Sequence, residues 1–144
     1  MTAEPSRAAA TVALPVAPCQ RLLDRFLDGP CEVAAALLAT ADGHLVAVAR
    51  RMDFDAARIA TMSGSILALA EACTRELRLG ACRNAIVDGE RGLTVLMRVA
   101  TPRGAWTLTT VGARDTSMGL LYTHTRQLAE SLAAVANAVD PSPE

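Results

Sequence analysis

One segment of the chain, RIATMSGSILALAEACTREL from Arg58 to Leu77, limits the fold more than any other. Its apolar residues recur at intervals of three and four, which indicates an α-helix, yet no residue from Ile59 to Ala70 is charged. A helix on the surface of a globular protein normally keeps one polar face. We therefore expect this helix to be covered on two sides.

The predicted helix spans residues 54–79 and has two apolar stripes. Asp53 is placed to accept a hydrogen bond from an unpaired N–H of the first turn, and Gly80 is placed to end the helix. The stripe of larger side chains is expected to lie on a β-sheet. It consists of Ile59, Met62, Ile66, Leu69, Cys73 and Leu77.

The second stripe of this helix is made mostly of small residues. It consists of Ala56, Ala60, Ser63, Leu67, Ala70 and Thr74. Small residues let two helix backbones approach closely, and a twofold axis would bring this stripe against its own copy. The sequence therefore predicts a homodimer with Leu67 in the seam. The alternative is that Ala, Ser and Thr simply tolerate exposure to solvent.

Apolar runs and turn residues predict the elements on either side of the long helix. Before it come a helix over residues 19–28 and two strands joined by the turn Ala41–His44. After it the helical period changes to alternation, which predicts three strands within residues 83–111 and a last helix over 116–139. An α/β fold with a five-stranded antiparallel sheet and helices on both faces satisfies this order, α-β-β-α-β-β-β-α.

The folded part is expected to be one domain. A chain of 144 residues can bury roughly 70% of its unfolded surface. The composition, 51% hydrophobic and 20% charged, is typical of a chain that folds. Residues 1–16 and 140–144 lack an amphipathic period and are expected to be flexible tails of a domain that spans 17–139.

The charge pattern argues against nucleic acid and membranes as partners. The formal net charge is −1, and the basic residues form no run and no pattern with aromatic residues. No uncharged helical run reaches the ~18 residues of a membrane span, and the N-terminal segment lacks the basic start of a signal peptide. We expect a cytoplasmic protein; its abundant Ala and its lack of Lys indicate GC-rich codons and a bacterial source.

No motif in the sequence predicts an enzyme. The patterns GxxxxGK[ST], GxGxxG, GxSxG and HExxH, which mark nucleotide-binding, hydrolase and zinc-protease sites, are all absent. His44 falls on a predicted turn and His124 on the last helix, and neither has a nucleophile near it in sequence. We therefore assign no catalytic residue and no cofactor.

The cysteines do not predict a metal site. They are Cys19, Cys31, Cys73 and Cys82. They form no CxxC pair and have no histidine at metal-ligand spacing. Free, partly buried thiols are expected, with a disulfide as the alternative.

Taken in order, these segments resemble the Roadblock (dynein light chain) family. The resemblance lies in LLATADGHLVA at the first hairpin, IATMSGSILALAEACTREL in the long helix, RNAIVDGERGLTVLMRV in the next two strands and DTSMGLLYTHTRQLAESL at the start of the last helix. It covers about residues 17–139. Each segment alone is a core pattern with turn glycines, but their order and spacing together are specific.

The resemblance implies a longin-like or profilin-like α/β sandwich that forms homodimers. In this family the long helix and the middle strand pair across the twofold axis and join two five-stranded sheets into one. On this chain the pairing strand would be residues 83–87, which adds Arg83, Ala85 and Val87 to the predicted interface. An unpaired edge strand is otherwise a liability.

Bacterial members of the family are associated with Ras-like small GTPases, which they bind as dimers and whose GTP hydrolysis they stimulate. The resemblance therefore implies a non-catalytic homodimeric regulator or scaffold of such a GTPase, and GTPase activation is the stronger form of this hypothesis. Two alternatives stay open. One is a structural adaptor for a motor, kinase or filament complex, and the other is a small-ligand sensor, which needs a sizeable pocket.

Three arginines on predicted loops are candidates for contact with the partner. They are Arg50, Arg51 and Arg114. An arginine inserted into a GTPase site stabilises the charge that develops during phosphoryl transfer. The alternative is a solvated loop arginine, and the resemblance does not identify an inserted one.

Overall fold

A computed structural model describes residues 15–29, 31–102 and 104–139. The elements in chain order are α2 (Val16–Leu27), β1 (Val33–Thr40), β2 (Leu45–Arg50), α3 (Ala56–Glu76), β3 (Ala85–Gly89), β4 (Gly92–Thr101), β5 (Gly104–Gly112) and α4 (Met118–Val139). The predicted order and the α/β fold class are confirmed. Most of the two expected tails lies outside the described residues. Val16, which was assigned to the N-terminal tail, is the first residue of α2. The helix can include Pro18 because this residue lies in the first turn, where a backbone N–H has no partner within the helix.

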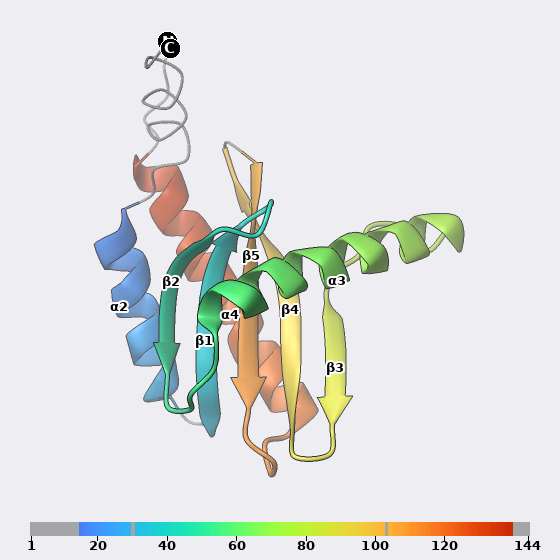
Figure 1. Cartoon of the computed structure of the whole chain (residues 1–144). Helices are drawn as coiled ribbons and strands as arrows, with labels where there is room; N and C mark the ends of the chain where they lie inside the picture. The colour runs from blue at the N-terminus through green and yellow to red at the C-terminus, as the bar shows by residue number, and fades with distance from the viewer. Residues whose placement is uncertain (1–14, 30, 103, 140–144) are drawn as a thin grey trace.

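The five strands form one antiparallel sheet in the order β2-β1-β5-β4-β3. β1 and β2 form a hairpin, β3, β4 and β5 form a meander, and β1 joins the two by pairing with β5. α2 and α4 cover one face of the sheet, and α3 crosses the other (Figure 1). The sheet edges are therefore β2 and β3.

The larger core lies between the sheet and the pair α2 and α4. Its fully buried members include Leu23, Leu38, Val95, Leu108 and Leu132. Burying one such aliphatic side chain stabilises the fold by about 1.5–3 kcal/mol. This face therefore holds most of the large apolar side chains.

The face of the sheet beneath α3 is lined by smaller residues. Alanines of β1 and threonines of β5, Thr107 and Thr109 among them, are buried there around Leu37. At the hairpin between β1 and β2, Gly43 has φ +95°, and an added Cβ would lie 3.1 Å from Thr61 Cα of the helix. A Cβ on Gly64 of α3 would lie 3.5 Å from the carbonyl oxygen of Ala41. Helix and hairpin therefore approach closely, which only small residues permit.

The side of α3 that meets the sheet is the small stripe, and of the predicted large stripe only Ile59 and Ile66 are half-buried, with Ile59 packed on the core beneath α3. Ala60, Ser63 and Leu67 face the sheet and are at most 3% exposed. The reason is the fit just described: a face of alanine and threonine accepts the small side of the helix, and the Ser63 hydroxyl accepts a 2.8 Å hydrogen bond from Thr109 Oγ1. The prediction that the large stripe lies on the sheet is wrong. Met62 and Leu69 point away from it and are 48% and 72% exposed.

The ends of α3 also differ from the prediction. The N-cap is Asp55 instead of Asp53, and its carboxylate accepts a hydrogen bond from Arg58 N at 3.2 Å. At the other end the chain turns at Arg78, whose φ is +58°, before it reaches Gly80. The bonds Leu79 N to Thr74 O and Arg78 N to Arg75 O close this end of the helix.

Candidate interaction surface

The outer side of α3 is an exposed apolar stripe. Met62, Leu69 and Leu77 are 48%, 72% and 61% exposed, and the thiol-bearing Cys73 is exposed between them. Isolated exposed leucines are common on protein surfaces, but a row of them along one helix is a feature of interaction sites. The stripe is therefore a candidate binding surface.

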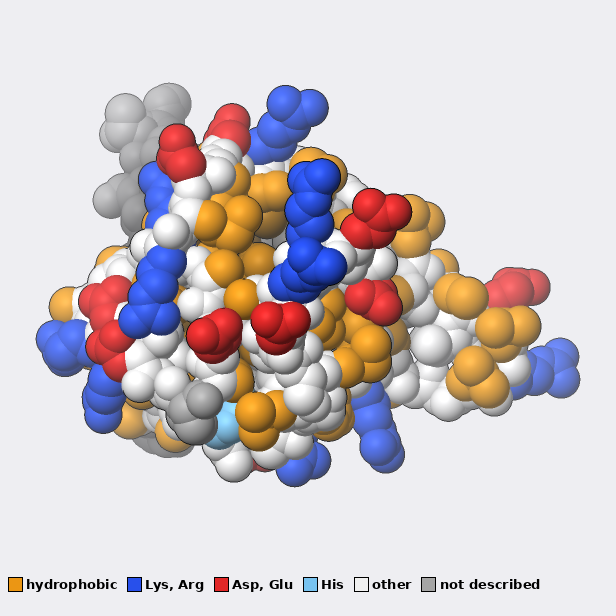
Figure 2. Space-filling view, turned by 90° about the horizontal axis from the view of Figure 1, so that it is seen from below, with side chains coloured by type: hydrophobic (Ala, Val, Ile, Leu, Met, Phe, Trp, Pro, Cys, Tyr) orange, Lys and Arg blue, Asp and Glu red, His pale blue; other side chains and the backbone are white. Residues whose placement is uncertain are grey.

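The C-terminal half of α3 projects past the edge of the sheet. Figure 1 shows it running beyond β3, and Figure 2 shows hydrophobic side chains on the resulting lobe, with charged side chains around them. No strand formed by the described residues lies beneath the lobe. Apolar side chains on the lobe can therefore be covered only by another molecule or by a rearrangement of the chain.

One ion pair ties the beginning of this half to the sheet. Arg98 of β4 donates to both carboxylate oxygens of Glu71, at 2.9 and 3.0 Å, and to Thr107 Oγ1 at 2.6 Å. The hydrogen bonds from Arg98, with its positive charge, hold the pKa of Glu71 below its ordinary value. A two-point contact of this kind fixes direction as well as distance. It therefore fastens the start of the projecting half to β4.

The β3 edge lies next to the projecting helix, and within the described part of the chain no strand pairs with its outer side. Ile86 and Val87 are 36% and 46% exposed there. Val87 pairs with Thr94 and Ala85 with Leu96, so both side chains lie on the α3 face of the sheet. An apolar edge strand without protection is a ready template for pairing with another chain.

The predicted dimer residues divide into two groups. Ala56, Ala60, Ser63 and Leu67 are buried in the chain's own core, so their assignment to a dimer seam is wrong. Ala70 and Thr74 are half-buried at the flank of α3, while Arg83, Ala85 and Val87 lie at or before the open edge; their role stays a prediction. The structure adds Met62, Leu69, Cys73 and Leu77 to this surface. The abundance of alanine in β1 is the sequence signal that could have indicated a sheet face able to accept the small side of the helix.

Two of the candidate partner-binding arginines are held within the chain. The Arg50 guanidinium donates to Phe54 O at 2.6 Å and lies 5.3 Å from the centre of the Phe54 ring. Arg51 donates to Leu27 O at 2.6 Å and to Asp28 Oδ1 at 2.8 Å. Arg114 is exposed between β5 and α4, and no hydrogen-bond acceptor among the described residues engages it.

All three arginines lie at the same end of the sheet. Arg50 pairs with Ala35 near the start of β1, and Arg51 follows it. Gly112, two residues before Arg114, pairs with Val33 at the same end. Figure 2 looks at this end and shows basic and acidic side chains interleaved over it. The three arginines thus lie at one end of the molecule, but acidic side chains among them prevent a continuous positively charged patch.

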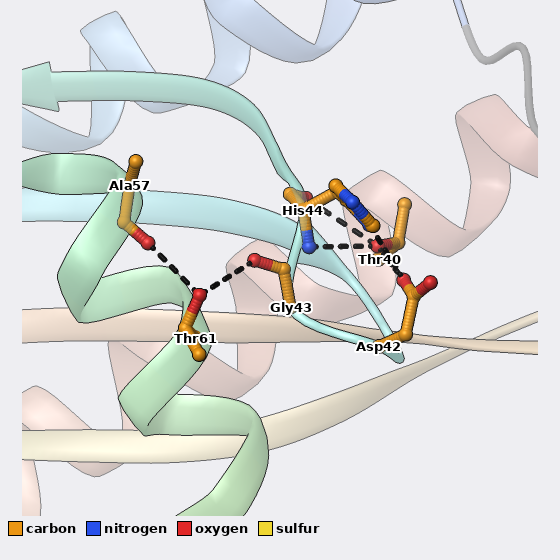
Figure 3. Close-up of polar contacts among 6 residues, drawn as sticks. All are labelled: Thr40, Asp42, Gly43, His44, Ala57 and Thr61. Atoms are coloured by element: carbon orange, nitrogen blue, oxygen red, sulfur yellow. Dashed lines mark hydrogen bonds and ion pairs between the residues drawn. The ribbon is translucent and has the colours of Figure 1, made fainter.

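The hairpin tip carries the polar cluster nearest to a catalytic arrangement (Figure 3). Thr40 Oγ1 donates to Asp42, and His44 Nδ1 lies 3.1 Å from Asp42 Oδ1. The hydrogen bond from Thr40, followed by that from His44, lowers the pKa of Asp42. Both the imidazole and the carboxylate are exposed, and the cluster closes the turn through the bond from His44 N to Thr40 Oγ1 at 2.9 Å. Its geometry is that of a stabilised turn, with Thr61 of α3 donating to Gly43 O at 3.4 Å.

The cysteines do not come together among the described residues. Cys19 and Cys31 are buried, and burial raises the pKa of both thiols. Cys73 is exposed, Cys82 is half-buried, and none of the four is in a disulfide within the described chain. Within the same residues, no group of three metal-ligating side chains occurs and no helix is long and apolar enough to cross a membrane.

The sandwich with a long crossing helix and an open third strand defines the class: the structure has the Roadblock/LC7 fold. It is similar to Myxococcus xanthus MglB, with a TM-score of 0.77 and 13% identity over 90% of this chain and 96% of that one. The gliding protein MglB of Thermus thermophilus gives a TM-score of 0.75 and 19% identity over 86% and 92%. The Roadblock/LC7 domain of Streptomyces avermitilis gives 0.69 and 16% over 78% and 92%.

No protein-family model matches the sequence, and no curated protein matches it significantly. The resemblance noted in the sequence is therefore confirmed by structure, at the level of the fold. At sequence identities of 13% to 19%, the similarity shows the shared fold and does not assign a binding partner to this chain.

Proposed function

We propose that this protein is a homodimeric regulator or scaffold that binds a Ras-like small GTPase and has no chemistry of its own. One observation carries the proposal: the exposed stripe of α3 lies beside the open β3 edge, on a Roadblock-type fold. The bacterial, cytoplasmic setting expected from the sequence agrees with it.

The second copy would bind along both parts of this surface. Antiparallel pairing of two β3 strands would join the two sheets, and the projecting helices of the two copies would then lie side by side, with their exposed apolar stripes in contact. Leu69, Cys73 and Leu77 would be covered by the partner, and the backbone groups of β3 would gain hydrogen bonds. The same contact would therefore remove two exposed features at once.

In this proposal the dimer regulates the GTPase by binding one of its conformations, without supplying a catalytic group. A dimer that binds one switch conformation more tightly than the other shifts the GTPase towards it, and ordering the catalytic groups of the GTPase accelerates hydrolysis. Support for such a non-catalytic role comes from Arg50 and Arg51, whose guanidinium groups are held by carbonyl oxygens of their own chain. Of the three candidate arginines, Arg114 is the one whose donors no acceptor among the described residues engages.

The test is light scattering with size-exclusion chromatography on the protein alone and mixed with the small GTPase encoded nearest to its gene. The GTPase is loaded with GDP or with a GTP analogue. We expect a dimer that forms a complex with the analogue-bound form, and GTP hydrolysis that is faster in the mixture. A dimer that binds neither form would contradict the GTPase role and favour the adaptor, and a monomer would contradict the dimer.

A further inference from the structure

A groove lies between α2 and α4, on the face of the sheet opposite to α3. Its volume is about 220 Å³. Leu22, Arg25, Phe26 and Gly29 line it from the α2 side, and His124, Gln127, Leu128 and Ser131 line it from α4. The α4 residues have the spacing i, i+3, i+4, i+7 of one helix face, and Leu22, Arg25 and Phe26 share a face of α2, while Gly29 and Cys31 line the groove from the segment that follows α2. The groove is therefore built by the packing of two regular elements.

The groove combines an apolar floor with polar donors. Leu22, Phe26 and Leu128 provide the apolar part. The donors are Arg25, His124, Gln127 and Ser131, and no acceptor among the described residues engages any of their side chains. No carboxylate is among the lining residues. Among the described residues that line the groove, Arg25 therefore carries the only permanent charge, and that charge is positive.

The neighbouring acidic residues of α2 are already engaged elsewhere. Asp24 accepts a hydrogen bond from Gln20 at 3.0 Å, and Asp28 pairs with Arg51 at 2.8 Å. Neither carboxylate is thus committed to Arg25. The charge complementary to this surface is an anion that arrives from outside, and a carboxylate matches the planar fork of an arginine best.

The size of the groove favours a protein side chain over a small molecule. Ligand pockets usually enclose about 300–1,000 Å³ and bury most of the ligand. This groove is smaller and open to solvent, which suits one large apolar side chain that arrives on another protein.

We propose that the α2–α4 groove is a docking site for a segment of a partner protein that carries a large apolar side chain next to an Asp or Glu. The apolar side chain packs on Leu22, Phe26 and Leu128, and the carboxylate accepts hydrogen bonds from Arg25. This site goes beyond the proposed GTPase role. Because it lies on the other face of the sheet from α3, a segment bound there leaves the α3 stripe and the β3 edge accessible.

The test uses three short peptides that share a Leu-Phe centre. One is flanked by Asp and Glu, one by Asn and Gln, and one by Lys on both sides. Each is titrated into the ¹⁵N-labelled full chain and followed by the backbone amide signals. We expect the acidic peptide to shift signals of residues 22–29 and 124–131 and to bind about tenfold more tightly than the neutral one, which corresponds to about 1.4 kcal/mol. The basic peptide should bind most weakly.

Two variants and a control locate the contact. Arg25→Gln should reduce the affinity for the acidic peptide to that for the neutral one. Arg21→Gln changes an exposed arginine one turn earlier, outside the groove, and should leave binding unchanged. Ser131→Trp fills the groove from an exposed position and should abolish binding of the acidic and the neutral peptide.

Several results would overturn the docking site. They are equal affinity for the three peptides, shifts confined to α3 or β3, no shift at millimolar peptide, or an unchanged response in Arg25→Gln. A free carboxylic acid, 3-phenylpropionate, that binds as tightly as the peptide would replace the docking site with a small-ligand site. The dimer mass and GTPase binding of Arg25→Gln should equal those of the unmodified protein, so failure here is distinguishable from failure of the proposed function.

Discussion

The two edges of the sheet are protected in different ways. At the β2 edge, α2 packs alongside the strand, and Gln20 Nε2 donates to Val48 O at 2.8 Å, so a side chain of the same molecule satisfies the edge backbone. At the β3 edge no such cover exists among the described residues, and Ile86 and Val87 are exposed beside the projecting α3. A chain that closes one edge and leaves the other apolar and open has a preferred side for association.

The largest expected effect is a difference in stability between substitutions on the inner and on the outer side of α3. Leu67→Arg would place a charge where the side chain is 1% exposed and should cost about 4 kcal/mol or more, which unfolds most of the protein. Leu69→Arg, at a position 72% exposed, should fold normally and be monomeric. Thermal unfolding followed by circular dichroism and light scattering measure the two outcomes. A folded Leu67→Arg would contradict the orientation of the helix, and a dimeric Leu69→Arg would contradict the interface on its outer side.

The next effect compares the two edges directly. Val87→Lys puts a charge on the open edge and should weaken dimerisation at least tenfold, or by about 1.4 kcal/mol, without destabilising the monomer. Leu45→Lys, at a β2 position that is 37% exposed, is the matched control and should leave the dimer unchanged. Sedimentation equilibrium gives both constants. If Leu45→Lys has the larger effect, the wrong edge has been assigned.

A smaller effect concerns the ion pair that fastens the projecting half of α3 to β4. Glu71→Gln should cost about 1 kcal/mol of stability, because Glu71 and Arg98 are partly exposed and solvent screens the pair. Glu76→Gln, on the exposed side of the same helix, should change stability little. Urea unfolding measures both.

The same pair predicts a pH dependence. The pKa of Glu71 is lower in the folded chain than its ordinary value of about 4.3, so the stabilisation is complete above that value and is lost as pH falls through the folded pKa. The stability difference between the unmodified protein and Glu71→Gln should therefore shrink in acid. A difference that is constant down to about pH 3, or one that grows, would contradict the contribution assigned to the ion pair.

The smallest effect tests the closed edge. Gln20→Ala removes the side-chain donor to Val48 O and should cost about 0.5–1 kcal/mol, since water can replace the donor at this partly buried site. The dimer constant should not change. A rise in higher oligomers on sedimentation would show instead that Gln20 is needed to keep the β2 edge from pairing.

Local patterns predicted the fold well because each element has its own signal. The Asp-Gly turn and the alternation from Leu93 to Val99 predicted the first hairpin and a meander strand, and both are present. The face of α3 that meets the sheet could not be predicted in the same way. Both stripes are apolar, and the choice between them depends on the side chains of β5, especially Thr109, which come later in the chain.

The site was predicted only in part for the same reason. Val87 was named because the resemblance to the Roadblock family implies a pairing strand at residues 83–87, whereas Leu69 was missed because it was assigned to the core. The groove residues Arg25 and His124 are far apart in sequence, and only the packing of α2 on α4 brings them to one place.

The central claim is that a second copy binds at the β3 edge and the outer side of α3. The most direct measurement is an isotope-filtered nuclear Overhauser experiment on a mixture of labelled and unlabelled copies, which detects contacts between molecules only. We expect such contacts from the amides of β3 and from the methyl groups of Leu69. Contacts at β2 or at the α2–α4 face, without any at β3, would contradict the account.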